Sequence, residues 1–259
     1  MKKIATLLFL TLLIASCGQI FNKFKFRSSQ NPQSVSGLFN ADQLNLKVYY
    51  ESGAEPYVGG PLPSFKYWDL AQKNLEALFV GKDKAPSISV PKELNEMSQL
   101  SSYNKATWSA QEVLDISKSL PADTTSFQIF FLNGVSDESA NTIGFHISGT
   151  RIIAVFKDVI KNMTQTEADP LVPRYVEQST IIHEMGHALG LVNNGLPMVT
   201  AHQDVAHGAH CNDPNCVMYY SNEGTTTMTA FAKQAAIKGS VVIFDQACLD
   251  DAKSYTPPK

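Results

Sequence analysis

Two histidines and a glutamate stand close together in residues 181–190, which read IIHEMGHALG. His183 and His187 are four residues apart, so on a helix they lie on the same face, one turn from each other. Two neutral imidazoles in this arrangement can bind one zinc ion, and Glu184, beside the first of them, can take a proton from a water molecule at the metal. The spacing therefore predicts a metal centre with its own general base, carried on a helix.

This HExxH arrangement is that of zinc peptidases, and the glycine that follows it refines the resemblance. Gly190 stands where the metzincin pattern HExxHxxGxxH has its helix-ending glycine, which permits the sharp turn that brings a third ligand back to the metal. The usual position of that ligand holds Asn193, and asparagine is a poor zinc ligand compared with imidazole or carboxylate. We therefore expect either an altered site or a third ligand from later in the chain.

A later segment resembles the missing part of the pattern. Residues 210–218 read HCNDPNCVM and resemble the archaemetzincin string HCx4CxM, which contains that family's third histidine and its Met-turn methionine. A 17-residue insertion, residues 193–209, precedes this segment here, and leishmanolysin is a metzincin with an insertion at the same point. The resemblance implies His210 as the third zinc ligand and Met218 as a hydrophobic floor beneath the metal.

The insertion contains further candidate ligands. His202, Asp204 or His207 can serve as the third ligand in place of His210, bind a second ion, or hold the liganding imidazoles by hydrogen bonds. No motif fixes their spacing, so an ordinary solvated loop is the alternative interpretation of these residues.

Two tyrosines follow Met218. Tyr220 stands two residues after it, as does the switching tyrosine of astacin-like metzincins, and this resemblance implies that Tyr220 donates a hydrogen bond to the oxyanion. Tyr219 is the alternative donor, and either residue can equally be a packed aromatic side chain.

Three cysteines, Cys211, Cys216 and Cys248, lie in the C-terminal part of the chain. Archaemetzincins complete a second zinc site with a later CxxC pair, which this chain lacks. A disulfide between Cys211 and Cys216 is therefore the favoured prediction for an exported protein. Pairing of Cys248 with either of the other two, or a thiolate metal site, are the alternatives.

The first residues, MKKIATLLFLTLLIASC, combine two lysines with a short apolar run and resemble a bacterial lipoprotein signal. We expect a signal peptide over residues 1–16, a lipid on Cys17 that anchors the protein in the membrane, and a polar tether over residues 17–40. An ordinary cleaved signal is the alternative. Glycine rather than aspartate follows Cys17, which favours the outer membrane of the cell envelope by resemblance to Gram-negative lipoproteins.

The composition favours one globular domain over residues 41–259. The chain has 259 residues, of which 44% are hydrophobic, so a substantial core can form. Only 17% of residues are charged and the net charge is −3, which excludes the basic surface that a nucleic-acid partner needs.

Hydrophobic periodicity and turn residues predict an alternation of strands and helices. The helix over 65–80 begins with Ser64 as N-cap, the helix over 110–120 has a capping box of Ser109 and Glu112, and a hairpin turns at Gly149. The predicted strands are 46–50, 88–90, 127–132, 142–147 and 151–156, and the predicted helices are 65–80, 110–120, 173–189, 228–238 and 245–254.

These patterns together predict an α+β, metzincin-like zincin domain: a mixed twisted sheet with two helices on one side, an active-site helix and an irregular C-terminal subdomain. The implied function is that of a zinc-dependent endopeptidase that hydrolyses proteins or peptides through a zinc-activated water, with Glu184 as general base. The alternatives are a surface lipoprotein that uses the fold only for binding, and a zinc amidase that acts on cell-wall peptides. We expect a monomer, with an edge strand within 142–156 that pairs with an extended substrate.

Overall fold

The computed structural model describes residues 35–60, 62, 64–121 and 126–257. The signal peptide and the lipid-bearing Cys17 that the sequence predicts lie outside these residues. Within them, no helix combines the length and the apolar character needed to cross a bilayer.

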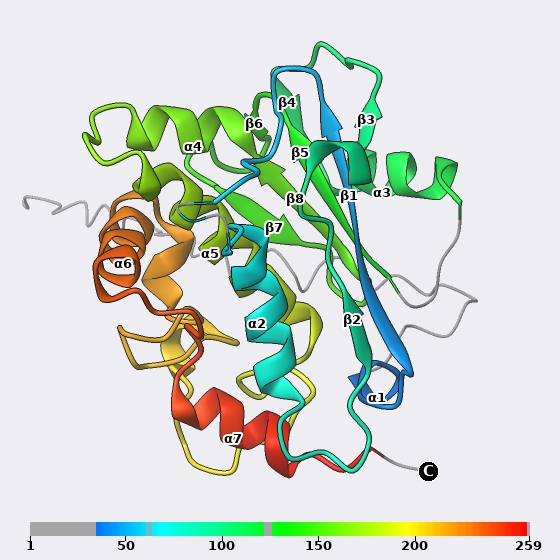
Figure 1. Cartoon of the computed structure of the whole chain (residues 1–259), viewed down its shortest axis with the longest axis vertical. Helices are drawn as coiled ribbons and strands as arrows, with labels where there is room; N and C mark the ends of the chain where they lie inside the picture. Colours follow the sequence, from blue (N-terminus) through cyan, green and yellow to red (C-terminus); the bar gives the residue numbers. More distant parts are fainter. Residues whose placement is uncertain (1–34, 61, 63, 122–125, 258–259) are drawn as a thin grey trace, which may run out of the picture.

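A mixed sheet forms the centre of the domain (Figure 1). Its strand order is β2-β1-β5-β8-β7, with β3 paired to β1 beside β2, and all pairs are parallel except the antiparallel β7–β8 hairpin. The strands are β1 (Gln43–Glu51), β2 (Ser87–Ser89), β3 (Ser98–Leu100), β5 (Ser126–Leu132), β7 (Gly144–His146) and β8 (Ile152–Phe156). The expected mixed sheet and the expected hairpin with its turn at Gly149 are confirmed.

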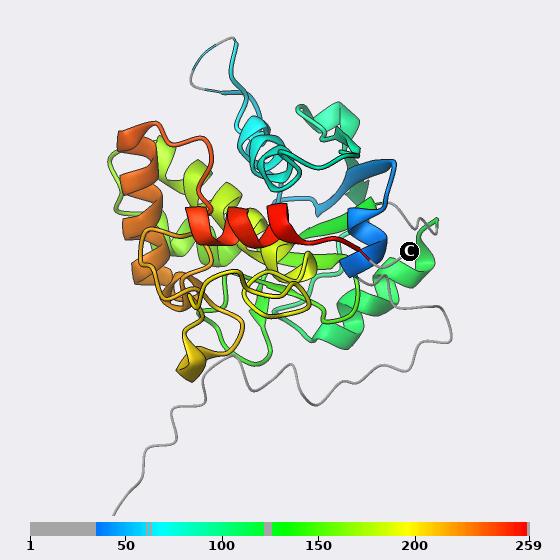
Figure 2. The same ribbon diagram turned by 90° about the horizontal axis from the view of Figure 1, so that it is seen from below.

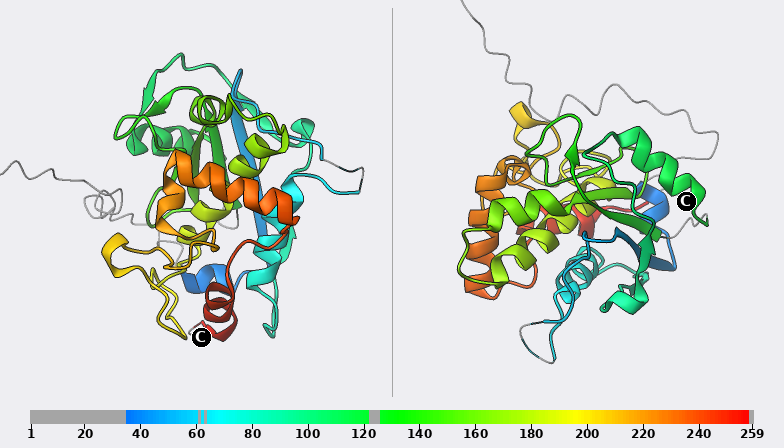
Figure 3. Two further views of the ribbon diagram at one scale, coloured as in Figure 1. Left: turned by 90° about the vertical axis from the view of Figure 1, so that its left-hand side faces the viewer. Right: turned by 90° about the horizontal axis from the view of Figure 1, so that it is seen from above.

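Every residue of β5 and β8 is buried, because helices cover both faces of the sheet. The helix α2 (Trp68–Leu78) packs Trp68 against Phe131 of β5, whereas α3 (Ala110–Ser119) hydrogen-bonds Ser117 to Gln128 of the same strand. Residues 128 and 131 point to opposite faces of a strand, so α2 and α3 lie on opposite sides of the sheet (Figure 3). The expectation that two helices share one side holds for α2 and α5, but α3 is on the other side.

The central helix is α5 (Leu171–Ala188), which lies against β7 and β8 and packs on α2 (Figure 1). It begins two residues earlier than predicted because the Asp169 carboxylate accepts a hydrogen bond from the Leu171 amide at 2.8 Å and caps the first turn. It ends at Ala188, one residue before the predicted end and two before Gly190. That glycine has φ +81°, and a Cβ there would lie 2.5 Å from Cγ2 of Val35, so both the backbone conformation and the space exclude a larger residue.

The predicted capping box of α3 is confirmed, since the Ser109 side chain accepts from the Glu112 amide and the Glu112 side chain accepts from the Ser109 amide. The predicted start of α2 is wrong. The helix begins at Trp68, and the Asp69 carboxylate accepts from the Lys66 amide at 2.6 Å, so an acidic residue inside the first turn takes the capping role expected of Ser64.

Two helices were not expected. Residues 35–39, assigned to the tether, form the short helix α1 (Val35–Phe39), which buries Leu38 and Phe39 in the core. The helix α4 (Lys157–Thr164) follows β8 directly, and its Lys157 forms a buried ion pair with Glu177 of α5. The Glu177 carboxylate also accepts from the Tyr57 amide at 2.7 Å, so these contacts fix α5 against the rest of the domain.

The C-terminal part is irregular between its helices, as expected (Figure 2).

Elsewhere in the domain, two short segments, β4 (Thr107–Trp108) and β6 (Val135–Ser136), form a separate two-stranded sheet. The remaining elements are the 3-10 helices η2 (Leu94–Glu96), η3 (Val205–His207) and η4 (Tyr220–Glu223) and the helices α6 (Thr225–Lys238) and α7 (Gln246–Ser254).

Candidate metal centre

The helix α5 presents two imidazoles side by side. His183 and His187 have ring centroids 4.7 Å apart, and their Nε2 atoms are separated by 3.1 Å. His183 is almost completely buried, because this end of α5 lies beneath the sheet and the C-terminal loops. The i, i+4 spacing therefore brings the two nitrogens to one point.

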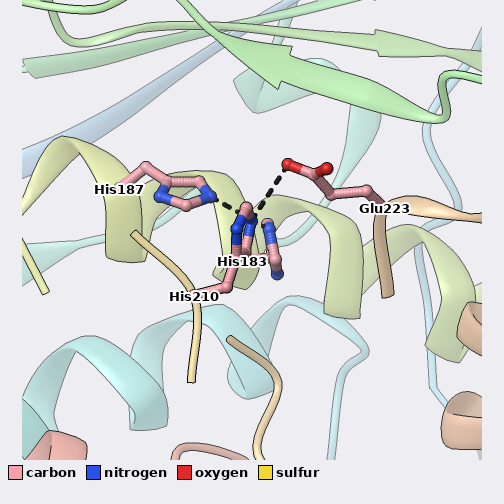
Figure 4. Close-up of side chains that lie close together, drawn as sticks. All are labelled: His183, His187, His210 and Glu223. Carbon is pink, nitrogen blue, oxygen red and sulfur yellow. Dashed lines mark hydrogen bonds and ion pairs between the residues drawn. The ribbon is translucent and has the colours of Figure 1, made fainter. Parts of the chain in front are cut away.

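The loop that ends at Cys211 brings a third imidazole, that of His210, to the same point. The ring centroid of His210 lies 5.3 Å from that of His183 and 4.8 Å from that of His187. Backbone hydrogen bonds on both sides hold this residue, from the Asp204 amide to the His210 carbonyl at 2.7 Å and from the Cys211 amide to the Met218 carbonyl at 2.8 Å. The three rings converge as Figure 4 shows.

A fourth donor, Glu223, was missed by the sequence analysis. It is the last residue of η4, and its Oε1 lies 3.0 Å from Nε2 of His210. The neighbouring Asn222 is buried and donates to the carbonyls of Cys216 and Val217, both at 3.1 Å, which fixes the turn that presents Glu223. The sequence motifs do not include this glutamate, and its role as a donor follows only from the position of the 3-10 turn.

The hydrogen bonds of the outer ring nitrogens orient the imidazoles inward. Nδ1 of His183 donates to the Val217 carbonyl at 2.7 Å, and Nδ1 of His210 donates to the His207 carbonyl at 2.6 Å. These partners place the proton on Nδ1, so the Nε2 lone pairs face the centre of the cluster, which is the arrangement typical of metal-binding histidines.

The cluster fits a zinc ion. The donor atoms of the three histidines and Glu223 all lie within 4.8 Å of one another, including Nε2 of His210, which is 3.0 Å from Oε1 of Glu223. Zn–N bonds of about 2.0–2.1 Å in tetrahedral geometry separate neighbouring donors by about 3.3 Å, close to the 3.1 Å between the nitrogens of His183 and His187. A divalent cation at this point would satisfy lone pairs that no proton donor reaches.

The environment keeps His183 and His187 neutral and favours the protonated form of Glu184, whereas the Glu223 carboxylate raises the pKa of His210 against the opposing effect of burial. Burial lowers the pKa of His183 to about 4, with a further contribution from His210, and burial also lowers the pKa of His187 well below its usual range. Neutral imidazole is the form that binds a metal. Burial raises the pKa of Glu184 well above its usual range, the charge of Glu223 raises it further, and the His146 backbone amide opposes the shift.

Met218 lies directly against the middle of α5, between the turns that carry His183 and His187. A Cβ placed on Gly186 would collide with Sδ of Met218, and Met218 is completely buried. The contact places the methionine under the turn of α5 that separates the two histidines, the position that the resemblance gives to a Met-turn residue.

The edge strand β7 passes beside this cluster. Phe145 pairs with Ala154, and the flanking bonds are Phe156 amide to Ile143 carbonyl and Ile147 amide to Ile152 carbonyl. In an antiparallel ladder the intervening residues turn their backbone groups the other way, so Gly144 and His146 direct theirs toward the open edge. The side chain of His146 is buried, and its Nε2 donates to the Thr150 carbonyl at 2.8 Å.

The structure does not bring the alternative third ligands into the cluster. Asn193, which has φ +59°, donates through its side chain to Gln203, and Asp204 pairs with His207 at 2.7 Å. His202 belongs to a separate group of side chains on α7 and the 202–216 loops. Tyr220 is stacked on His207 with ring centroids 3.6 Å apart, which places it beside the loop that holds His210, and Tyr219 packs against Tyr220.

The predicted Cys211–Cys216 disulfide is wrong. All three cysteines in the described part of the chain are free and buried. Sγ of Cys211 donates to Asp245 at 3.1 Å, and Sγ of Cys216 lies 3.7 Å from Sγ of Cys248.

No protein-family model matches the chain, and a search of curated proteins finds no match. Among solved structures, an archaemetzincin from Methanopyrus kandleri is similar, with 14% sequence identity and a TM-score of 0.42 over 83% of this chain and 96% of that chain. A zinc-dependent peptidase from Methanocorpusculum labreanum (strain Z) is similar with 12% identity and a TM-score of 0.43, over 80% of this chain and 99% of that chain. The function proposed below therefore depends on the residues of this chain.

Proposed function

We propose that this protein is a zinc-dependent endopeptidase of the metzincin type, in which His183, His187 and His210 hold the zinc ion and Glu184 is the general base. The observation that carries the proposal is the convergence of three inward-facing imidazoles next to a buried carboxylate. Zinc, when bound, supplies a Lewis acid that polarises a carbonyl oxygen and makes water a stronger acid.

Glu184 performs the proton transfers. Its carboxylate follows the first zinc-binding histidine directly, accepts a hydrogen bond from the His146 amide and is almost completely buried. It takes a proton from the attacking water and delivers it to the nitrogen of the leaving amine, as a general base and then a general acid.

The edge of β7 binds the substrate backbone. The backbone groups of Gly144 and His146 face this edge, and the His146 amide donates to Glu184, which lies next to the edge as the general base. An extended peptide that adds as a strand here passes its backbone by the metal centre. We assign Tyr220 as the residue whose phenol donates to the carbonyl oxygen of the substrate as negative charge develops on it.

A test of the proposal compares Glu184→Gln with the wild type in zinc content and in casein hydrolysis. We expect the variant to retain its zinc and to lose hydrolysis by about 100- to 10,000-fold, the usual contribution of general acid–base catalysis. Glu76→Gln, a change at a surface residue of α2 that pairs with Lys73, is the matched control. Hydrolysis that survives in Glu184→Gln would contradict the proposed mechanism. Cell-wall peptides assayed in parallel separate an amidase from a peptidase.

Glu223 favours one other function, binding without catalysis. Four protein donors close a zinc site and make it structural, whereas three donors leave a position open for catalysis. The side chain of Glu223 is 25% exposed and that of His210 is 4% exposed, so we assign Glu223 as an exchangeable donor and the three imidazoles as the fixed set.

Glu223→Gln distinguishes these two functions. The peptidase proposal predicts that the variant keeps one zinc ion on the three histidines, with affinity reduced by no more than about 10- to 100-fold, as for the loss of a supporting contact. A non-catalytic site in which Glu223 is a permanent ligand predicts that this zinc is lost on purification. Isothermal titration of the metal-free protein with zinc measures the difference.

We also propose that the enzyme is exported and anchored to the cell envelope by a lipid on Cys17, on the support of the N-terminal sequence pattern alone. Fractionation of cells that express the wild type or Cys17→Ser tests this. We expect the wild type with the membranes and the variant without lipid, and a wild type that is released in soluble form would contradict the anchor.

A further inference from the structure

A second group of potential metal ligands lies behind the first. The donor atoms of His202, Cys211, Asp245 and Cys248 all fall within 4.8 Å of one another, and Sγ of Cys216 lies 3.7 Å from Sγ of Cys248. The three cysteines are completely buried. The proposed peptidase mechanism uses none of these side chains.

His202 is held in the orientation that a metal ligand needs. Its Nε2 donates to the Asp251 carboxylate at 2.7 Å, and Asp251 is itself completely buried. This bond places the proton on Nε2, so the lone pair of Nδ1 points to Sγ of Cys211, 3.4 Å away. A carboxylate behind an imidazole is the usual outer partner of a zinc-binding histidine.

Three separate segments bring the donors together. His202 comes from the insertion, Cys211 and Cys216 flank the turn that follows His210, and Cys248 lies in the first turn of α7. The Asn212 amide donates to the His202 carbonyl at 2.8 Å, and the Cys248 amide donates to the Asp245 carboxylate at 2.8 Å. Asp245 therefore already serves as the N-cap of α7, which leaves His202 and the cysteines as the donors without another structural role.

The cysteine chemistry favours a metal over a disulfide. Three thiols in mutual contact cannot all be paired, and a disulfide would leave the oriented His202 without a role. Three cysteines and one histidine in a closed, buried site are a donor set of structural zinc.

We propose that Cys211, Cys216, Cys248 and Nδ1 of His202 bind a second, structural zinc ion. These donors differ from the cysteine-only set of archaemetzincins, since this chain lacks the later CxxC pair. An imidazole from the insertion and a single cysteine from α7 replace it.

The second ion has a consequence for the first centre. Cys211 follows His210 directly in the chain, so a metal bond to its sulfur fixes the backbone that presents the third imidazole. The same ion joins the insertion to α7. The insertion is thereby a structural support for the proposed catalytic centre.

Zinc analysis and cobalt substitution of the full-length protein test this proposal. Elemental analysis is expected to give two zinc ions per chain for the wild type and one for Cys248→Ser, Cys216→Ser and His202→Ala. With Co²⁺ in place of zinc, the wild type is expected to show the near-ultraviolet charge-transfer band of thiolate–cobalt bonds, and the same variants are expected to lose it.

Matched controls separate this site from the proposed catalytic site. His207→Ala alters another histidine of the insertion, outside the cysteine cluster, and is expected to keep the thiolate–cobalt band. His183→Ala is expected to lose one zinc ion and to keep the band. Absence of hydrolysis in a wild type that contains two ions would overturn the peptidase and leave the second site intact.

Two results would overturn the second site. One is a wild type without the thiolate–cobalt band in which non-reducing peptide mapping finds a Cys216–Cys248 disulfide. The other is a wild type whose three thiols react with a thiol reagent at the same rate with and without a chelator. Both measurements use the wild type, so they remain decisive where a variant fails to fold.

Discussion

Two groups of potential metal ligands share the segment 210–218 but differ in chemistry and in exposure. His210 faces three oxygen and nitrogen donors of the first group, and the next residue, Cys211, faces the sulfur-rich second group. The first group includes the partly exposed Glu223, whereas the cysteines of the second are completely buried. The difference separates an open site suited to catalysis from a closed site suited to structure.

Loss of the closed site is expected to have the largest effect. Cys248→Ser is expected to remove the contribution of the structural ion to stability, which is about 4 kcal/mol when free zinc is 1,000 times its dissociation constant. Thermal unfolding with zinc and with a chelator measures this contribution. Chelation is expected to lower the Tm of the wild type much more than that of Cys248→Ser, and an equal effect on both would contradict a structural role.

At the first site, Gly186→Ala tests the packing of Met218 beneath the histidines. The new methyl group collides with Sδ of Met218, so we expect a loss of about 1–3 kcal/mol of stability, the usual cost of overpacking, together with weaker zinc binding by the three histidines. The thiolate–cobalt band of the second site serves as the internal control and is expected to remain. A variant with unchanged stability would contradict this packing.

The smallest expected effect comes from Asp251, the carboxylate behind His202 at the second site. Asp251→Asn keeps the shape of the side chain but removes the charge behind His202, and we expect zinc affinity at the cysteine site to fall by about 10- to 100-fold. Competition with a chromogenic chelator measures this affinity. The first site is expected to keep its affinity, and a fall at both sites would indicate general destabilisation.

The sequence predicted the parts of the molecule that depend on local spacing. The i, i+4 histidines, the capping box of α3 and the hairpin at Gly149 each follow from contacts within a few residues, and the structure contains all three arrangements. The segment containing His210 was found through a motif, although a 17-residue insertion separates it from the helix.

The parts that sequence analysis missed depend on contacts between distant segments. Glu223 reaches the first cluster through the 3-10 turn after Met218, and no spacing rule predicts that turn. The disulfide prediction failed because sequence proximity favoured Cys216 as the partner of Cys211, whereas the fold brings Cys248 to Cys216 from 32 residues away. The predicted start of α2 was wrong because Asp69, inside the first turn, accepts from the Lys66 amide, whereas the sequence suggested Ser64 as the capping residue.

Anomalous X-ray scattering at the zinc absorption edge, from crystals of the zinc-loaded protein, tests the central claim most directly. We expect two anomalous peaks in each molecule, one between His183, His187 and His210 and one among Cys211, Cys216, Cys248 and His202. Absence of a peak among the three histidines would contradict the proposed peptidase, and absence of a peak among the cysteines would contradict the structural site.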